Sequence, residues 1–195
     1  MNQAMSQWET VNGVKFLKRI GLKSGQTVVD FGCRVGHYTI PAAKVVGDEG
    51  IVYAVDKEQQ ALNELEQKAT GLNLKNIIKI NTSGQLQIEI EDNSIDMVLF
   101  YDVLHYHGKK DRESLYAEAY RVLKQDGLLS VYPKHILGDN PIMEFQNLSL
   151  GKIKREIHNS NFVFGTKHCG FISHDDNLNQ GCVLNFRRTG NVFDI

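Results

Sequence analysis

Short apolar runs alternate with amphipathic stretches along the first two thirds of the chain. Apolar runs bounded by turn residues predict five strands, over 27–32, 51–56, 76–80, 94–102 and 127–133. Helical periodicity is present between and before them, over 14–20, 37–46, 58–71 and 112–124. Nearly continuous apolar strands that alternate with helices predict a parallel sheet covered on both faces.

The last third of the chain has a different pattern. "GKIKREIHNSN" (151–161) predicts one more helix. "FVFGTKHCGFIS" (162–173) and "GCVLNFRRT" (181–189) predict an antiparallel hairpin that closes one edge of the sheet, with "HDDNLNQ" between the strands. Residues 134–150 carry no clear pattern. The chain (1–195) is thus predicted to be one α/β domain, a doubly wound, mostly parallel sheet with a C-terminal antiparallel β-hairpin.

Composition narrows the class of protein. Hydrophobic residues make up 42% and charged residues 23% of the chain, which is typical of a globular protein in water. The net charge of −1 argues against nucleic acid as a partner. The N-terminus lacks the pattern of a signal peptide, and no apolar run has the length of a membrane span. Three widely spaced cysteines do not indicate a disulfide framework, so we expect a cytoplasmic protein without a membrane partner.

The stretch "VVDFGCRVGHYT" (28–39) combines a predicted strand, a glycine-rich turn and a helix start. Glycines let a ligand approach the backbone, and the helix N-terminus offers free N–H groups to an anion. Asp56 ends the next strand, twenty residues beyond Gly36, where a carboxylate can accept two hydrogen bonds from a ribose diol. Together they predict a ligand that contains a nucleoside.

The spacing of the two glycines distinguishes among nucleoside ligands. "D-x-G-x-x-x-G" differs from the dehydrogenase pattern and resembles the first motif of class I S-adenosylmethionine (SAM)-dependent methyltransferases. "YAVDKE", "NIIKINTS" and "SIDMVLFYDVLHY" resemble their second, third and fourth motifs, and "EAYRVLKQDGLLSVYP" resembles their late helix–strand pair. The resemblance covers about 13–133 in the family's order, and it is greatest to the small-molecule branch typified by the quinone-biosynthesis C-methyltransferases.

The resemblance implies a Rossmann-like fold and methyl transfer from SAM to a small-molecule acceptor, with S-adenosylhomocysteine as product. It places the SAM-binding core at about 13–133 and the substrate-side and hairpin region at about 134–195. Carried over by position, the cofactor-binding residues are Asp30, Gly32, Cys33, Arg34 and Gly36 in the glycine loop, Asp56 and Lys57 at the ribose, Asn81 and Thr82 at the adenine, and Tyr101 near the sulfonium. Asp30 is expected to orient the loop or reach the methionyl ammonium, and Cys33 to pack rather than react.

Arg34 departs from the family pattern, which usually has glycine at its position. One interpretation is that its guanidinium pairs with the methionyl carboxylate. The other is that the side chain points outward from a left-handed turn, which a non-glycine residue adopts at a cost of about 1–2 kcal/mol. A further alternative is that SAM binding is weakened or lost. We expect binding to be retained, because the acid, the outer glycines and Asp56 are all present.

Two groups of residues remain to be assigned. His105 and His107 follow the fourth strand, and we take His105 as the candidate catalytic base, although a structural hydrogen-bonding role is the simpler account. The segment 167–174 and Cys182 offer two histidines and two cysteines without the spacing of a zinc site, so no metal is expected.

Three further expectations concern function and assembly. The protein is expected to be a monomer or a homodimer, with residues 134–160 helping to cover the substrate. The main alternative is a non-catalytic SAM-binding or interaction protein on the same fold. A nicotinamide-dependent oxidoreductase is disfavoured by the glycine spacing.

Overall fold

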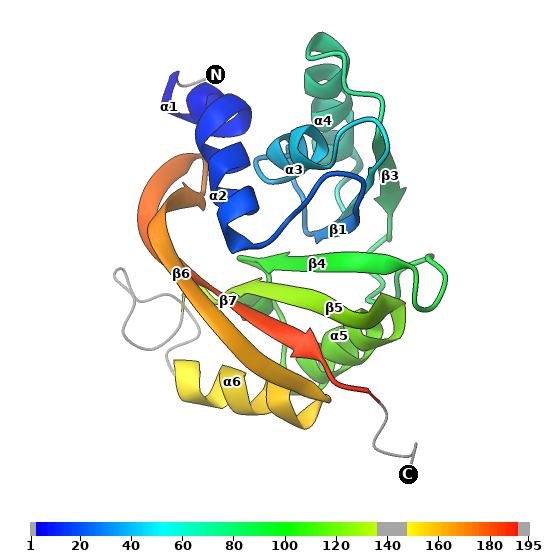
Figure 1. Cartoon of the computed structure of the whole chain (residues 1–195), viewed down its shortest axis with the longest axis vertical. Helices are drawn as coiled ribbons and strands as arrows, with labels where there is room; N and C mark the ends of the chain where they lie inside the picture. Colours follow the sequence, from blue (N-terminus) through cyan, green and yellow to red (C-terminus); the bar gives the residue numbers. More distant parts are fainter. Residues whose placement is uncertain (1–2, 136–147, 191–195) are drawn as a thin grey trace.

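The computed structural model describes residues 3–135 and 148–190, which form one seven-stranded sheet with helices on both faces (Figure 1). The order of the strands is β3-β2-β1-β4-β5-β7-β6. They are β1 (Thr27–Phe31), β2 (Ile51–Asp56), β3 (Ile77–Asn81), β4 (Ile95–Tyr101), β5 (Leu123–Tyr132), β6 (Phe162–His174) and β7 (Asn177–Arg188). β1 to β5 are parallel, whereas β7 is antiparallel to both β5 and β6. The predicted doubly wound sheet with a C-terminal hairpin is confirmed.

The helices divide between the two faces of the sheet (Figure 1). They are α1 (Gln3–Gln7), η1 (Trp8–Asn12), α2 (Gly13–Ile20), α3 (Thr39–Val46), α4 (Gln59–Gly71), η2 (Leu104–Tyr106), α5 (Lys109–Val122) and α6 (Leu150–Asn159). Successive residues of a strand face opposite sides, so Val28 packs with α2 and α3, and Val29 packs with α5 and α6. This alternation explains why the strands read as continuous apolar runs.

The hairpin is longer and tighter than the sequence pattern indicated. β6 and β7 are joined by Asp175 and Asp176, which have φ of 45° and 59°. Two consecutive left-handed residues match the twist of a two-residue hairpin turn, and aspartate tolerates this region better than most residues. Most of the predicted connection 174–180 therefore belongs to the strands.

The expectation about the cysteines was wrong for two of the three. Cys169 and Cys182 form a disulfide, because the register of β6 and β7 places them directly opposite each other. Cys33 is free and buried. An odd count of widely spaced cysteines hid this pair, since the register of a hairpin is fixed by its turn rather than by cysteine spacing. The cytoplasmic location thus loses one of its supports and stays a prediction.

Two further expectations concern membranes and the predicted cover over the substrate. Across 3–135 and 148–190, no helix has the length and apolarity of a membrane span. Part of the predicted cover is α6, whose Ile153 and Ile157 are buried in the core shared with α5 and β6. Residues 136–147 lie outside the described residues. Covering of the substrate by 134–160 therefore stays a prediction.

Candidate active site

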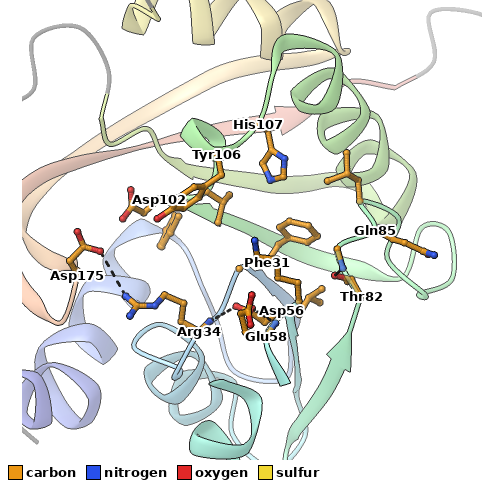
Figure 2. A pocket seen from close by; sticks show the side chains of 17 residues that line it. Phe31, Arg34, Asp56, Glu58, Thr82, Gln85, Asp102, Tyr106, His107 and Asp175 are labelled. Atoms are coloured by element: carbon orange, nitrogen blue, oxygen red, sulfur yellow. Dashed lines mark hydrogen bonds and ion pairs between the residues drawn. The ribbon is translucent and has the colours of Figure 1, made fainter. Parts of the chain in front are cut away.

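A cavity of about 400 Å³ opens at the carboxyl ends of β1, β2 and β4 (Figure 2). β1 has β2 on one side and β4 on the other, and the chain crosses to opposite faces of the sheet after these strands. Doubly wound folds bind ligands at this switch point, because the loops on either side diverge and leave a crevice. The cavity therefore lies where the sequence placed the glycine loop and Asp56.

The structure brings six of the ten predicted cofactor-binding residues to the cavity. These six are Gly32, Arg34, Asp56, Lys57, Thr82 and Tyr101. The other four do not line the cavity, and they are Asp30, Cys33, Gly36 and Asn81. Their contact with a cofactor stays a prediction, although each has a packing or hydrogen-bonding role in the loops that form the cavity.

The two glycines of the loop are required for different reasons. Gly32 has a φ of 78°, and a Cβ there would lie 2.3 Å from Cγ1 of Val103, which follows β4 and lines the cavity. Gly36 has a φ of 89°, and its Cβ would lie 2.4 Å from Cδ1 of Leu65 on α4. Neither conformation nor space admits a side chain. Gly32 therefore shapes the cavity, whereas Gly36 lets the loop pack against α4.

Asp30 and Cys33 connect the glycine loop to α3 and to the core beside α4. Oδ2 of the buried Asp30 accepts a hydrogen bond of 2.6 Å from Oγ1 of Thr39 at the start of α3. Burial raises the pKa of the Asp30 carboxyl to about 6. Burial also raises the pKa of the Cys33 thiol, which packs against Ile40 and Leu62 rather than facing the cavity. In this structure Asp30 therefore bonds the start of α3 and Cys33 packs in the core, and the contribution of either residue to SAM binding stays a prediction.

Asp56 joins the glycine loop to the end of β2. Its Oδ2 accepts the backbone N–H of Arg34 at 2.7 Å, and its Oδ1 accepts the backbone N–H of Glu58 at 2.9 Å. A carboxylate has about four lone-pair sites, so each oxygen retains capacity for a ligand hydroxyl. Because Asp56 also lines the cavity, it is placed to accept hydrogen bonds from a diol.

Arg34 adopts the left-handed conformation, with a φ of 45°. Its guanidinium reaches the turn between β6 and β7, where it lies 3.8 Å from Oδ1 of Asp175 (Figure 2). It also lies 3.7 Å from Oδ2 of Asp176 in the same turn. The side chain is 56% exposed. The outward interpretation therefore describes this conformation, and a contact with a methionyl carboxylate stays a prediction.

The loop after β3 also lines the cavity, through Thr82, Gly84 and Gln85. The backbone N–H of Thr82 donates to the carbonyl of Asp56, and Oγ1 of Thr82 accepts the backbone N–H of Gly84. Asn81 is exposed, and its amide donates to the carbonyl of Lys57 at 3.3 Å, so it supports the loop after β2.

Tyr101, the last residue of β4, lines the cavity. Its buried hydroxyl is 2.7 Å from Oγ of Ser130, and burial raises its pKa, so the phenol stays protonated.

Several residues that line the cavity were not anticipated, among them Phe31, Glu58, Gln85, Asp102, Tyr106 and Asp175. Phe31, Glu58 and Asp102 lie at or just after strand ends that the sequence identified, so the strand-end rule applied residue by residue would have included them. Asp175 belongs to the distant hairpin. Its approach to Arg34 depends on tertiary packing that no local pattern encodes.

The two histidines after β4 have different surroundings. His107 lines the cavity. His105, the predicted base, is buried beside the cavity with its ring 3.8 Å from the ring of Tyr106 and 4.4 Å from that of His135, measured between centroids. Burial lowers the pKa of His105 to about 4. Its imidazole is therefore neutral near pH 7, and a catalytic role for it stays a prediction.

Comparisons with known proteins agree with this geometry. Residues 28–127 match the family model described as a methyltransferase domain. The chain is 32% identical over 117 residues to the demethylmenaquinone methyltransferase of Lactobacillus johnsonii, covering 60% of this chain and 47% of that protein. It is 38% identical over 83 residues to a probable cobalt-precorrin-6B C(15)-methyltransferase of Saccharolobus solfataricus, covering 42% of each protein. The chain thus spans less than half the length of these two curated relatives.

Solved structures share the fold over nearly the whole chain. A SAM-dependent methyltransferase from Aquifex aeolicus superposes with a TM-score of 0.72 at 24% identity, covering 93% of this chain and 92% of that one. The [4+2]-cyclase SpnF superposes with a TM-score of 0.73 at 13% identity, covering 91% of this chain and 80% of that one. At these identities the structures show the fold alone. The family model spans the strands, the glycine loop and Asp56, and the chain belongs to the class I SAM-dependent methyltransferases.

Proposed function

We propose that this protein transfers the methyl group of SAM to a small-molecule acceptor in the cavity at the carboxyl ends of β1, β2 and β4. The observation that carries the proposal is the position of Asp56. It lines the cavity, fixes the left-handed glycine loop through the N–H of Arg34, and keeps acceptor capacity on both oxygens.

The residues around the cavity fit the parts of SAM. Asp56 would accept hydrogen bonds from the ribose hydroxyls. Gly32 carries no Cβ, which would clash with Val103, so its backbone is open to the methionyl part. Apolar Phe31, Val55 and Leu86 suit the faces of an adenine, and the Thr82 side of the cavity suits its edge. When bound, SAM supplies a methyl group that its sulfonium makes electrophilic.

The protein contributes mainly by positioning. Tyr106 and Asp102 line the cavity beyond the glycine loop, on the side where an acceptor would meet the methyl group (Figure 2). Tyr101, at the end of β4, also lines the cavity. Holding two reactants in line removes much of the entropic part of the barrier, so an acceptor that is already nucleophilic needs no protein base. The mechanism therefore does not depend on His105.

The class of acceptor is supported by the curated relatives, which are named as methyltransferases of demethylmenaquinone and of a cobalt-precorrin. Both names give a small molecule as the methyl acceptor. The net charge of −1 and the largely apolar cavity wall favour a small organic acceptor over nucleic acid. We also propose that the protein is cytoplasmic and that it is a monomer or a homodimer.

Calorimetric titration with SAM, S-adenosylhomocysteine and NAD tests cofactor choice. We expect both sulfur compounds to bind and NAD not to bind. Asp56→Asn should weaken SAM binding by about 2 kcal/mol, because a buried charge-assisted contact is lost. Asp48→Asn is the matched control, since Asp48 is exposed in the turn before β2. Tight binding of NAD without SAM, or equal SAM affinity in both variants, would contradict the proposal.

Methyl transfer itself separates an enzyme from a non-catalytic SAM-binding protein. SAM labelled on its methyl group is incubated with the wild type and a panel of quinols, phenols, thiols and tetrapyrroles, and label in the organic extract is counted. We expect transfer to at least one acceptor and loss of transfer in Asp56→Asn. SAM binding without transfer to any acceptor class would favour the non-catalytic alternative.

A further inference from the structure

Three potential metal ligands from distant parts of the chain meet beside the cavity. Asp102 follows β4, His135 follows β5, and His174 is the last residue of β6. One ligand atom from each lies within 4.8 Å of the others. β6 and β5 are both antiparallel to β7, so β6 runs in the same direction as β5 and β4. All three side chains therefore emerge at the edge of the sheet that holds the cavity.

The carboxylate of Asp102 is the centre of this cluster. Its Oδ2 lies 2.5 Å from Nδ1 of His174, which is a hydrogen bond. Its Oδ1 lies 3.5 Å from Nε2 of His135, and within the described chain this buried oxygen has no hydrogen-bond partner. His135 is 4% exposed, and its Nδ1 also has no hydrogen-bond partner there. Buried polar atoms almost always have partners, so these two require an explanation.

The spacing of these atoms fits a shared cation better than a second hydrogen bond. Ligand atoms held about 2.1 Å from one tetrahedral ion lie roughly 3.4 Å apart. Nε2 of His135 lies at that separation from Oδ1 of Asp102, and Nδ1 of His105 lies 3.4 Å from the same oxygen. A hydrogen-bonded pair of Asp102 and His174 accounts for one carboxylate oxygen and leaves the other unexplained.

We propose that Asp102, His135 and His174 bind a divalent transition-metal ion of the zinc type. Two imidazoles and one carboxylate are donors that such ions prefer, and three protein ligands leave a coordination position open. Asp102 lines the cavity on the side assigned to the acceptor, so the proposed ion would lie beside that side of the cavity. Metal binding does not require the proposed function. Coordination of an oxygen or sulfur atom of the acceptor rests on it.

The neighbouring groups are compatible with a cation. Oδ2 of Asp175 lies 3.3 Å from Nε2 of His174 and adds negative charge. Asp102 and His135 both adopt left-handed backbone conformations, with φ of 58° and 61°. Aspartate and histidine tolerate this region better than most residues. The cluster shares only His174 with the segment 167–174, and Cys169 of that segment is joined to Cys182 in the disulfide.

Zinc titration of tag-free protein, first dialysed against a chelator, tests the site. We expect roughly one equivalent of Zn²⁺ to bind, and Asp102→Asn, His135→Gln and His174→Gln each to weaken binding at least about tenfold. His168→Gln is the control, because His168 lies on β6 outside the cluster and bonds Thr166. Co²⁺ in place of Zn²⁺ should give the visible absorption of a tetrahedral site in the wild type.

Three outcomes would overturn the site: no zinc binding by the wild type, unchanged binding in folded cluster variants, or equal loss in the His168 control. Circular dichroism and melting identify variants that fail to fold, and isosteric Asp102→Asn is the variant least exposed to that failure. SAM titration of the same samples keeps the two proposals separate. Zinc binding without SAM binding supports the metal site and contradicts the proposed function, and the reverse result contradicts the metal site.

Discussion

Arg34 offers a direct test of the left-handed glycine loop. Replacing it with alanine or with glycine removes the same guanidinium and the same contacts with Asp175 and Asp176. The hydrogen bond from its backbone N–H to Asp56 survives in both variants. The two variants therefore differ only by one Cβ at a φ of 45°, so their comparison isolates the backbone strain.

The size of the difference follows from two opposing effects. A Cβ in the left-handed region costs about 1–2 kcal/mol. Glycine loses about 0.4–1 kcal/mol more chain entropy on folding than alanine. The glycine variant should therefore be more stable than the alanine variant by about 1 kcal/mol, which raises Tm by about 2–4 °C in a domain of this size. The ion pairs lost from both variants are exposed and long, so they contribute at most about 1 kcal/mol.

Thermal melting of the wild type, Arg34→Ala and Arg34→Gly in low and high salt measures each contribution. The difference between glycine and alanine should not change with salt, whereas the difference between arginine and alanine should shrink as salt screens the ion pairs. An alanine variant that is more stable than the glycine variant would refute the left-handed assignment, because chain entropy alone favours alanine. SAM titration of the same proteins should show affinities within about tenfold, since the guanidinium points toward the hairpin.

Two further predictions concern stability. Asp30 has a pKa of about 6 in the folded protein against 3.8 ordinarily, so its protonated form favours the folded state at low pH. About 3 kcal/mol of stability is lost in total as pH rises from well below 3.8 to well above 6. Asp30→Asn should flatten this slope in urea unfolding at graded pH, and an unchanged slope would contradict the buried assignment. Cys169→Ser with Cys182→Ser should lower stability by up to about 3 kcal/mol through a looser unfolded chain. Reducing agent should mimic this loss in the wild type and have no effect in the double variant.

The parallel core was predictable because its information is local. Strands buried on both faces read as uninterrupted apolar runs, and the connecting helices read as periodic patterns, so five strands were placed within a few residues. β5 begins at Leu123 rather than Gly127, because pairing between Ile95 and Leu123 extends the strand into the end of the predicted helix. Such extensions depend on a neighbour in space and leave no mark in the periodicity.

The sequence placed a residue at the cavity where that residue follows directly from a strand end, and it did not anticipate the residues that the C-terminal hairpin brings there. Gly32 and Asp56 were identified because both lie at carboxyl ends of adjacent parallel strands, where position in the motif fixes position in space. The missing Cβ of Gly36 makes room for Leu65 of α4, and contact of Gly36 with the cofactor stays a prediction. A sequence motif indicates that a position must be glycine, and it does not indicate which neighbouring side chain or ligand leaves no space for a Cβ there.

The hairpin carries the part of the site that no motif contains. His37, in the loop before α3, bonds Glu9 of η1 through Nδ1 and Asp176 of the hairpin turn through Nε2, both at 2.7 Å. Arg34 reaches the same turn from the glycine loop, so the loop is held between the N-terminal helices and the hairpin.

β6 ends at His174, one residue before this turn, which places the hairpin against Asp102 as well. One structural element thus contacts both the predicted SAM loop and the proposed metal cluster. The register of β6 on β7 sets all of these contacts at once. A slip of one residue would therefore disturb the contact of His174 with Asp102 and the contacts of the turn aspartates with Arg34 and His37 together. The disulfide between Cys169 and Cys182 lies in that register and covalently excludes the slip.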